Sequence, residues 1–144
     1  MKNPTDLTIQ TWVRLVRAQQ TALSSVEAAL KKAGHPPLVW YDVLLELERA
    51  GADGLRPFEL ESALLLRQYG VSRLVERIEK AGYLAREACE DDARGQRLIL
   101  TPAGRDCRRE MWSTYAPAIE ASVGSKLTPA QTKTLSDLLG KLMA

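Results

Sequence analysis

Histidine and cysteine are scarce in this chain, and so are the catalytic and metal-binding patterns that depend on them. The 144 residues include one histidine and two cysteines. His35 stands beside two prolines, and no cluster of acids or cysteines surrounds it in the sequence. No glycine-rich phosphate loop or pair of metal ligands occurs either. These absences argue against an enzyme and predict neither a metal nor a bound cofactor.

Long apolar runs are also missing. No run approaches the roughly 20 residues that a membrane-spanning helix needs, and residues 1–6 lack the apolar core of a signal peptide. Cys89 and Cys107 are separated by a spacing unlike that of metal-binding or redox motifs. We therefore expect a cytoplasmic protein in which both cysteines are reduced and packed.

The net charge is only +2, but the charges are unevenly distributed. Residues 36–66 contain two arginines against six acids, a balance of −4, whereas residues 67–109 contain ten Lys and Arg against seven acids, a balance of +3. A local positive excess suits nucleic acid, although ordinary surface scatter would also produce it. The composition, 45% hydrophobic and 26% charged, fits one folded domain over residues 1–144.

The stretch from Arg67 to Leu84 is the most informative part of the sequence. Apolar side chains recur there at helical spacing and predict a buried face of Val71, Leu74, Val75, Ile78 and Ala81. The opposite face collects Tyr69, Ser72, Arg73, Glu76 and Lys80. Gly82 is predicted to end the helix. One face therefore belongs to the core, and the other is available for binding.

A short β-hairpin is predicted directly after this helix. Its first strand covers residues 84–89, its tip residues 90–95 and its return strand residues 96–100. Arg94 and Arg97 bring positive charge to the tip or beside it. A helix followed at once by a small hairpin is the winged helix-turn-helix pattern.

Five further helices are predicted around this segment, over residues 7–33, 38–50, 57–65, 101–123 and 127–143. Thr8 or Asp6 is the candidate N-cap of the first, and Pro117 is expected to kink the fourth. Residues 128–131 form a capping box at the start of the last. The short helix 57–65 is predicted to turn three leucines inward, Leu60, Leu64 and Leu65.

Three runs of this sequence resemble the multiple-antibiotic-resistance regulator (MarR) family of winged-helix transcription factors. They are Val71-Ser-Arg-Leu-Val-Glu-Arg-Ile-Glu-Lys-Ala-Gly-Tyr-Leu, Asp92-Ala-Arg-Gly-Gln-Arg and Leu100-Thr-Pro-Ala-Gly. Residues 41–47 and 55–60 extend the likeness, whereas Arg67 departs from the family's usual Ser or Thr. The resemblance implies a mainly α fold with a small β-hairpin wing. In that fold, residues 38–101 form the winged helix-turn-helix, and residues 1–35 and 102–144 form flanking dimerisation helices.

The resemblance implies a sequence-specific transcriptional regulator, most commonly a ligand-responsive repressor, that binds a pseudo-palindromic operator as a homodimer. The candidate DNA-binding residues are Gln68, Tyr69, Ser72, Arg73, Arg77, Arg94, Gln96 and Arg97. Arg73 suits a guanine or a phosphate, and Arg94 suits the minor groove. A salt bridge with Asp92 is the alternative role of Arg97.

The resemblance also implies a small aromatic or phenolic effector. Its candidate pocket residues are Trp12, Arg17, Trp40, Tyr41, Trp112 and Tyr115. The aromatic members could instead be core residues. Similarly, the helices at residues 7–30 and 127–143 could pack within one chain rather than form a dimer surface. The alternative function is a winged-helix module for protein-protein interaction that has no specific DNA binding.

Overall fold

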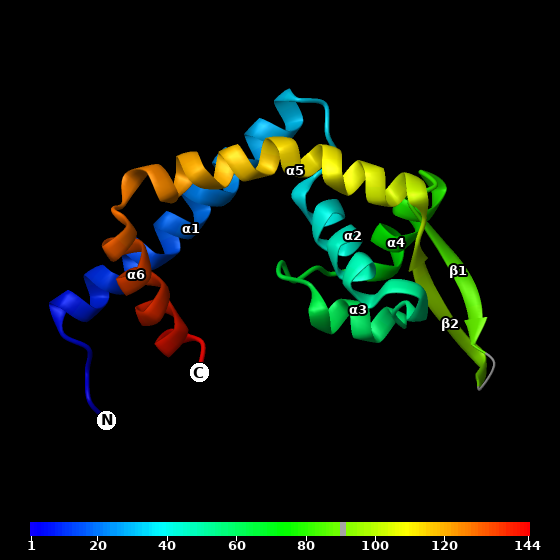
Figure 1. Ribbon diagram of the computed structural model, residues 1–144. Coiled ribbons are helices and arrows are strands. Elements are labelled where there is room, and N and C mark those ends of the chain that lie inside the picture. The colour runs from blue at the N-terminus through cyan, green and yellow to red at the C-terminus, as the bar shows by residue number, and fades with distance from the viewer. Residues whose placement is uncertain (90–91) are drawn as a thin grey trace. The chain divides into compact units, whose positions relative to one another are not determined.

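The computed structural model describes residues 1–89 and 92–144, with the backbone alone described for Cys89 and residues 92–94. These residues form mainly helices and one antiparallel hairpin, which confirms the predicted fold class (Figure 1). The elements are α1 (Asp6–Lys32), α2 (Leu38–Ala50), α3 (Pro57–Ala63), α4 (Val71–Lys80), β1 (Leu84–Cys89), β2 (Asp92–Leu100), α5 (Pro102–Ser122) and α6 (Pro129–Leu142).

The chain divides into two compact units. The central unit comprises Gly34–Ser113, and the terminal unit comprises Met1–Ala33 together with Thr114–Ala144. Helix α5 begins in the central unit and ends in the terminal unit. The predicted assignment of residues 38–101 to DNA binding and of both ends to dimerisation stays a prediction, because these units describe packing and not roles.

Helix α2 is central to the core of the central unit. Its apolar residues occupy several sides of the helix, so it is buried against α3 and β2 at once. Leu44 and Leu47 have no exposed surface. Fully buried side chains also come from α3, α4, β2 and α5, among them Leu60, Ile78, Leu98 and Met111. This single core fixes α3, α4 and the hairpin relative to one another.

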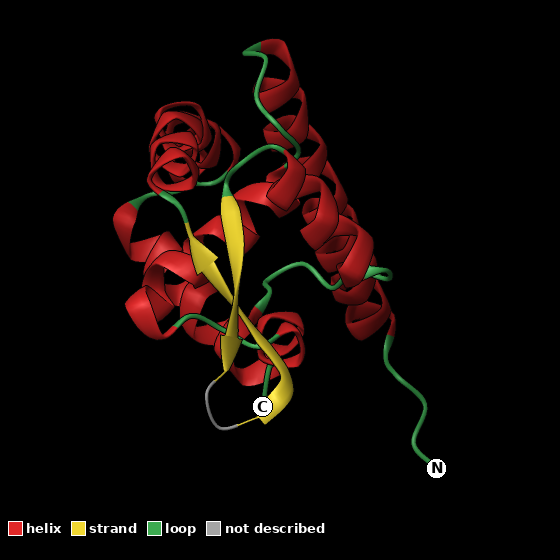
Figure 2. Ribbon diagram, turned by 90° about the vertical axis from the view of Figure 1, so that its right-hand side faces the viewer, coloured by secondary structure: helices red, strands yellow, loops and turns green. Residues whose placement is uncertain are grey.

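Strands β1 and β2 form one antiparallel hairpin (Figure 2). It pairs Leu84 with Leu100 and Ala88 with Gln96, and its register shifts between Ala88 and Cys89. Leu98 also exchanges backbone hydrogen bonds with Leu55, which joins the hairpin to the segment before α3. The predicted start of the return strand at residue 96 was wrong, because β2 begins at Asp92. The register shift lets the second strand run closer to the tip than a regular ladder would.

Three local expectations were wrong for physical reasons. Thr5, not Thr8 or Asp6, caps α1, since its Oγ1 accepts a hydrogen bond from the Thr8 N–H at 3.1 Å. Leu65 is 74% exposed, because the chain becomes extended at Leu64 and the helical period ends there. Ala81 is exposed because it lies beyond the last residue of α4.

The terminal unit, all of whose residues the structure describes, has almost no core of its own. Only Val26 and Leu30 are buried in it. Thr128 and Gln131 form the predicted capping box at the start of α6, and Pro117 lies inside α5. Among the described residues, no helix combines the length and the apolar character that crossing a membrane requires.

Candidate nucleic-acid interface

Helix α4 packs its apolar face against the core and so turns its polar face outward. Val71, Val75 and Ile78 are buried, whereas the opposite side exposes Ser72, Arg73, Glu76, Arg77 and Lys80. Arg73 and Arg77 form no ion pair with any described side chain. Both guanidinium groups are therefore available to an anionic partner such as DNA.

The turn from α3 to α4 carries two further candidates, Gln68 and Tyr69, and both are exposed. Asp42 of α2 holds this turn, since its Oδ2 accepts a hydrogen bond from the Leu66 N–H at 2.9 Å. Asp42 is 6% exposed and is the buried charged residue of the described core. Gly70 then adopts a φ of 74°, a left-handed conformation that suits glycine, and α4 begins at the next residue.

An arginine joins the wing to the segment before α3. Arg97 donates a hydrogen bond to the Asp53 carbonyl oxygen at 3.2 Å and lies 3.8 Å from Glu87 Oε2. It is half-buried, whereas Gln96 beside it is exposed. The side chains of Asp92 and Arg94 lie outside the described residues, so the predicted Asp92 pairing and the role of Arg94 at the wing tip stay predictions.

An ion pair ties the wing to the recognition helix. Arg86 of β1 donates through Nε to Glu79 Oε1 at 3.1 Å, near the C-terminal end of α4. This contact joins the hairpin to α4, and the Asp53 contact of Arg97 joins it to the segment before α3.

The aromatic candidates fall into two groups. In the central unit, Tyr41 stacks on Trp112 with ring centroids 6.1 Å apart, and Trp40 meets Tyr83 edge to face at 6.1 Å. Tyr41 is buried, so it contributes to the core. The remaining candidates, Trp12, Arg17 and Tyr115, belong to the terminal unit.

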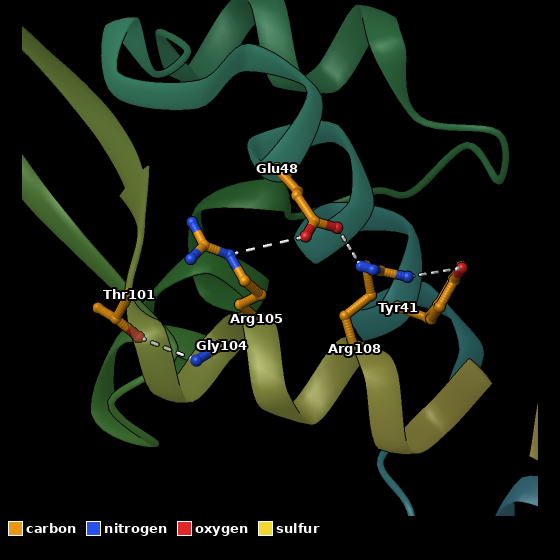
Figure 3. Close-up of polar contacts among 6 residues, drawn as sticks. All are labelled: Tyr41, Glu48, Thr101, Gly104, Arg105 and Arg108. Atoms are coloured by element: carbon orange, nitrogen blue, oxygen red, sulfur yellow. Dashed lines mark hydrogen bonds and ion pairs between the residues drawn. The ribbon is translucent and has the colours of Figure 1, made fainter. Parts of the chain in front are cut away.

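A polar network joins α2 to the first half of α5 (Figure 3). Glu48 pairs with Arg108 and lies 3.7 Å from Arg105 Nε. Arg108 also donates to the Tyr41 hydroxyl at 3.5 Å, and its guanidinium lies 6.0 Å from the Tyr41 ring centroid. Burial acts to lower the pKa of Arg108, but the hydrogen bonds with Tyr41 and Glu48 outweigh it and raise that pKa. Arg108 therefore lies between Glu48 and Tyr41 and contacts both.

Arg17 lines a hollow of about 680 Å³ within the terminal unit. Arg14 and Lys126 line it too, together with the apolar side chains of Ile9 and Val13. No acidic residue is part of this lining. A hollow with three cations and apolar walls favours an anion that has an apolar body.

Two residues at this interface escaped the sequence analysis. Asp42 could have been noticed as a lone acid within the apolar run Val39 to Leu45. Phe58 is 65% exposed and lines a second hollow beside the turn before α4. No sequence signal reveals that hollow, since its walls come from both α3 and the turn.

A family model described as MarR family matches residues 34–95. Sco3205 of Streptomyces coelicolor, a MarR family transcriptional regulator solved in complex with DNA, is similar over 99% of this chain and 89% of its own, with a TM-score of 0.89 and 27% identity. Residues 34–95 of this chain are therefore MarR-like, and the whole chain is similar to a solved MarR family regulator. The matched range contains Asp42, the turn before α4 and the whole of α4, so the MarR likeness covers most of the candidate interface.

Two further MarR-like structures share the fold. BpsR of Bordetella bronchiseptica, whose DNA binding is regulated by 6-hydroxynicotinic acid, has a TM-score of 0.82 and 23% identity over 98% of both chains. A cysteine-to-serine variant of MarR from E. coli, solved with operator DNA, has a TM-score of 0.81 and 20% identity over 99% of this chain and 100% of its own. These two structures share the winged-helix fold of this chain. The MarR family model and the Sco3205 structure support a DNA-binding transcriptional regulator and confirm the resemblance seen in the sequence.

Proposed function

We propose that this chain binds double-stranded DNA as a homodimer and acts as a ligand-responsive repressor at a pseudo-palindromic operator. The observation that carries the proposal is the outward face of α4, where Arg73 and Arg77 are exposed and form no ion pair with any described side chain. A helix of this kind fits the major groove, in which arginine recognises guanine through two hydrogen bonds. Gln68, Tyr69, Ser72 and the wing residues Arg94 and Gln96 complete the proposed contact set.

The terminal unit supports a homodimer. Apolar side chains are exposed on α1, on the second half of α5 and on α6, among them Leu7, Trp12, Ile119, Leu138 and Leu142. Surfaces this apolar are normally covered by another subunit. A second copy of the chain would provide matching apolar helices by symmetry, and two DNA-binding parts would then recognise two half-sites.

We further propose that a small aromatic or phenolic anion weakens DNA binding. The hollow of the terminal unit, with Arg14, Arg17 and Lys126, supports an anionic effector. 6-Hydroxynicotinic acid and benzoate are suitable first probes. An effector acts only through a difference in its affinity for the DNA-binding and released states. Release of bound DNA by millimolar probe in the wild type, but not in Arg17→Ala, would support this part.

The proposal places the protein in the cytoplasm and assigns it no enzymatic activity. It is supported by the scarcity of catalytic side chains in the sequence. Among the described residues, no group of three or more His, Cys, Asp and Glu side chains could hold a metal ion. Turnover of common hydrolase or transferase substrates by the purified chain would contradict it.

Binding of the purified protein to DNA from its own upstream region tests the proposal. Fluorescence anisotropy should show affinity at least about a thousandfold higher than for a scrambled duplex. Arg73→Ala should reduce specific binding by about tenfold or more, whereas Lys141→Ala on α6 serves as a charge-matched control. Arg94→Ala should lower affinity in the same direction.

A winged-helix module for protein contact predicts a different pattern. Specific and scrambled DNA would then bind equally weakly, and this binding would disappear as salt increases. Arg73→Ala would instead abolish a protein complex. The two unpaired arginines on α4 favour DNA over an apolar protein surface.

A further inference from the structure

Exposed apolar side chains gather on α3 and on the turn that leads from it to α4. Phe58 is 65% exposed, Leu65 is 74% exposed, and Tyr69 is completely exposed at 106%. Single exposed apolar residues are common on protein surfaces. Three of them close together in a DNA-binding part are less common. Their exposure to water is unfavourable, and a bound ligand could cover them.

Phe58 and Tyr69 face the same hollow. Its volume is about 500 Å³, and its apolar wall consists of Phe58, Leu64 and Tyr69. The rest of the lining is polar and contains Glu61, Ser62, Arg67 and Gln68. Leu65 is not part of this lining, although it is also exposed and belongs to the same segment.

The hollow lies beside the N-terminal end of the recognition helix. Tyr69 immediately precedes Gly70, the N-cap residue of α4. The N-terminal residues of a recognition helix are those that contact base edges. The wall is also held in position, because Asp42 accepts the Leu66 N–H from inside the core at 2.9 Å. A hollow with one apolar wall thus lies next to the part of the DNA that α4 would contact.

The chemistry of the lining selects a base edge over a phosphate. Both Glu61 and Arg67 line the hollow, so the repulsion of a phosphate by Glu61 offsets its attraction to Arg67. In the major groove, the C5-methyl group of thymine is the apolar group by which a base pair is distinguished. Aromatic and small apolar side chains make the contacts that recognise this methyl group.

We propose that Phe58 and Tyr69 bind the C5-methyl group of a thymine, once in each half-site of the operator. The inference rests on the proposed DNA-binding function and adds a specificity element to it. The two aromatic side chains supply apolar contact, and Gln68 lies beside them to hydrogen-bond a neighbouring base edge. One thymine position in each half-site is then distinguished from cytosine and uracil.

Replacement of thymine by deoxyuridine tests this inference, since it removes the methyl group alone. A specific duplex is first obtained by selection from a random pool, and each thymine is then replaced in turn. At one position per half-site, replacement should weaken wild-type binding by about fourfold, and by about fifteenfold when both half-sites are changed. Tyr69→Ala should bind thymine and uracil duplexes equally, within about twofold.

Matched variants separate the methyl contact from other effects. Tyr69→Phe keeps the ring and should keep the uracil penalty, and Leu65→Ala removes an exposed apolar side chain outside the hollow and should also keep it. Phe58→Ala should reduce the penalty. Equal urea midpoints would establish that these exposed substitutions leave the fold intact.

Three outcomes would overturn the inference. In the first, no thymine position is sensitive in the wild type. In the second, the uracil penalty persists in both Tyr69→Ala and Phe58→Ala. In the third, Leu65→Ala, outside the hollow, abolishes the penalty as fully as Tyr69→Ala does. If selection yields no specific duplex at all, the proposed function itself fails, and the methyl contact fails with it. Specific binding without uracil sensitivity leaves the proposed function standing and rejects the methyl contact alone.

Discussion

Removal of the Asp42 carboxylate should loosen the turn that leads into α4. Asp42 is 6% exposed, and its Oδ2 accepts the Leu66 N–H at 2.9 Å. A hydrogen bond to a charged group contributes about 1.5–3 kcal/mol. Leu66 is half-buried, so water can replace the lost acceptor in part. We therefore expect Asp42→Ala to lower the free energy of unfolding by about 2 kcal/mol. Asp42→Asn keeps a carbonyl acceptor of the same size and should lose only about 1 kcal/mol.

The same substitution should impair sequence recognition more than general DNA affinity. Gln68 and Tyr69 follow the anchored residue, so their positions depend on it, whereas phosphate contacts of α4 depend on it less. Urea unfolding gives the stability change, and anisotropy with specific and scrambled duplexes gives the binding change. Asp42→Ala should weaken specific binding by about tenfold and scrambled binding by less than about twofold. An equal loss on both duplexes would refute the positioning role, and an unchanged urea midpoint would refute the contribution to stability.

Three other substitutions or conditions test the packing. Leu138→Asp on α6, where Leu138 is 52% exposed, should weaken the dimer by about a hundredfold or more in sedimentation experiments, because it would bury a carboxylate; an unchanged dimer would exclude α6 from the interface. Gly104→Ala should lower the free energy of unfolding by about 1–3 kcal/mol, since the added Cβ would collide with the Tyr83 carbonyl oxygen. The control is Gly140→Ala, whose added Cβ meets no other atom of the chain. In thermal unfolding this control should be neutral or stabilising. Burial raises the pKa of the Cys107 thiol above its ordinary value of 9.0. The neutral thiol therefore contributes fully to stability below pH 9.0, and this contribution is lost as the pH rises through the raised pKa. Unfolding measured up to pH 11 should show this alkaline loss in the wild type and less of it in Cys107→Ala.

Local periodicity was sufficient to predict much of the fold. Val71, Val75 and Ile78 recur at helical spacing and are buried as predicted, because a helix that covers a core must place apolar residues on one side. The capping box that begins at Thr128 also depends on adjacent residues alone. Leu65 was mispredicted because the helix ends two residues before it, at Ala63, and no local pattern marks that end.

The interface was less predictable, because its important contacts join distant segments. Asp42 and Leu66 are 24 residues apart, and Arg97 reaches the Asp53 carbonyl across 44 residues. The sequence could place the arginines on the outward face of α4 but could not show that Phe58 and Tyr69 line one hollow. Such a hollow exists only after α3 and the turn pack on α2.

Selection of binding sites from a random duplex pool tests the central claim most directly. A homodimer that places one α4 in each of two major grooves should enrich a sequence with two-fold symmetry, with half-site centres about 10 base pairs, or one helical turn, apart. Enrichment of such a sequence, lost when Arg73 is replaced by alanine, is the result that this account predicts. A pool without enrichment, or one that converges on a single asymmetric site, would contradict it.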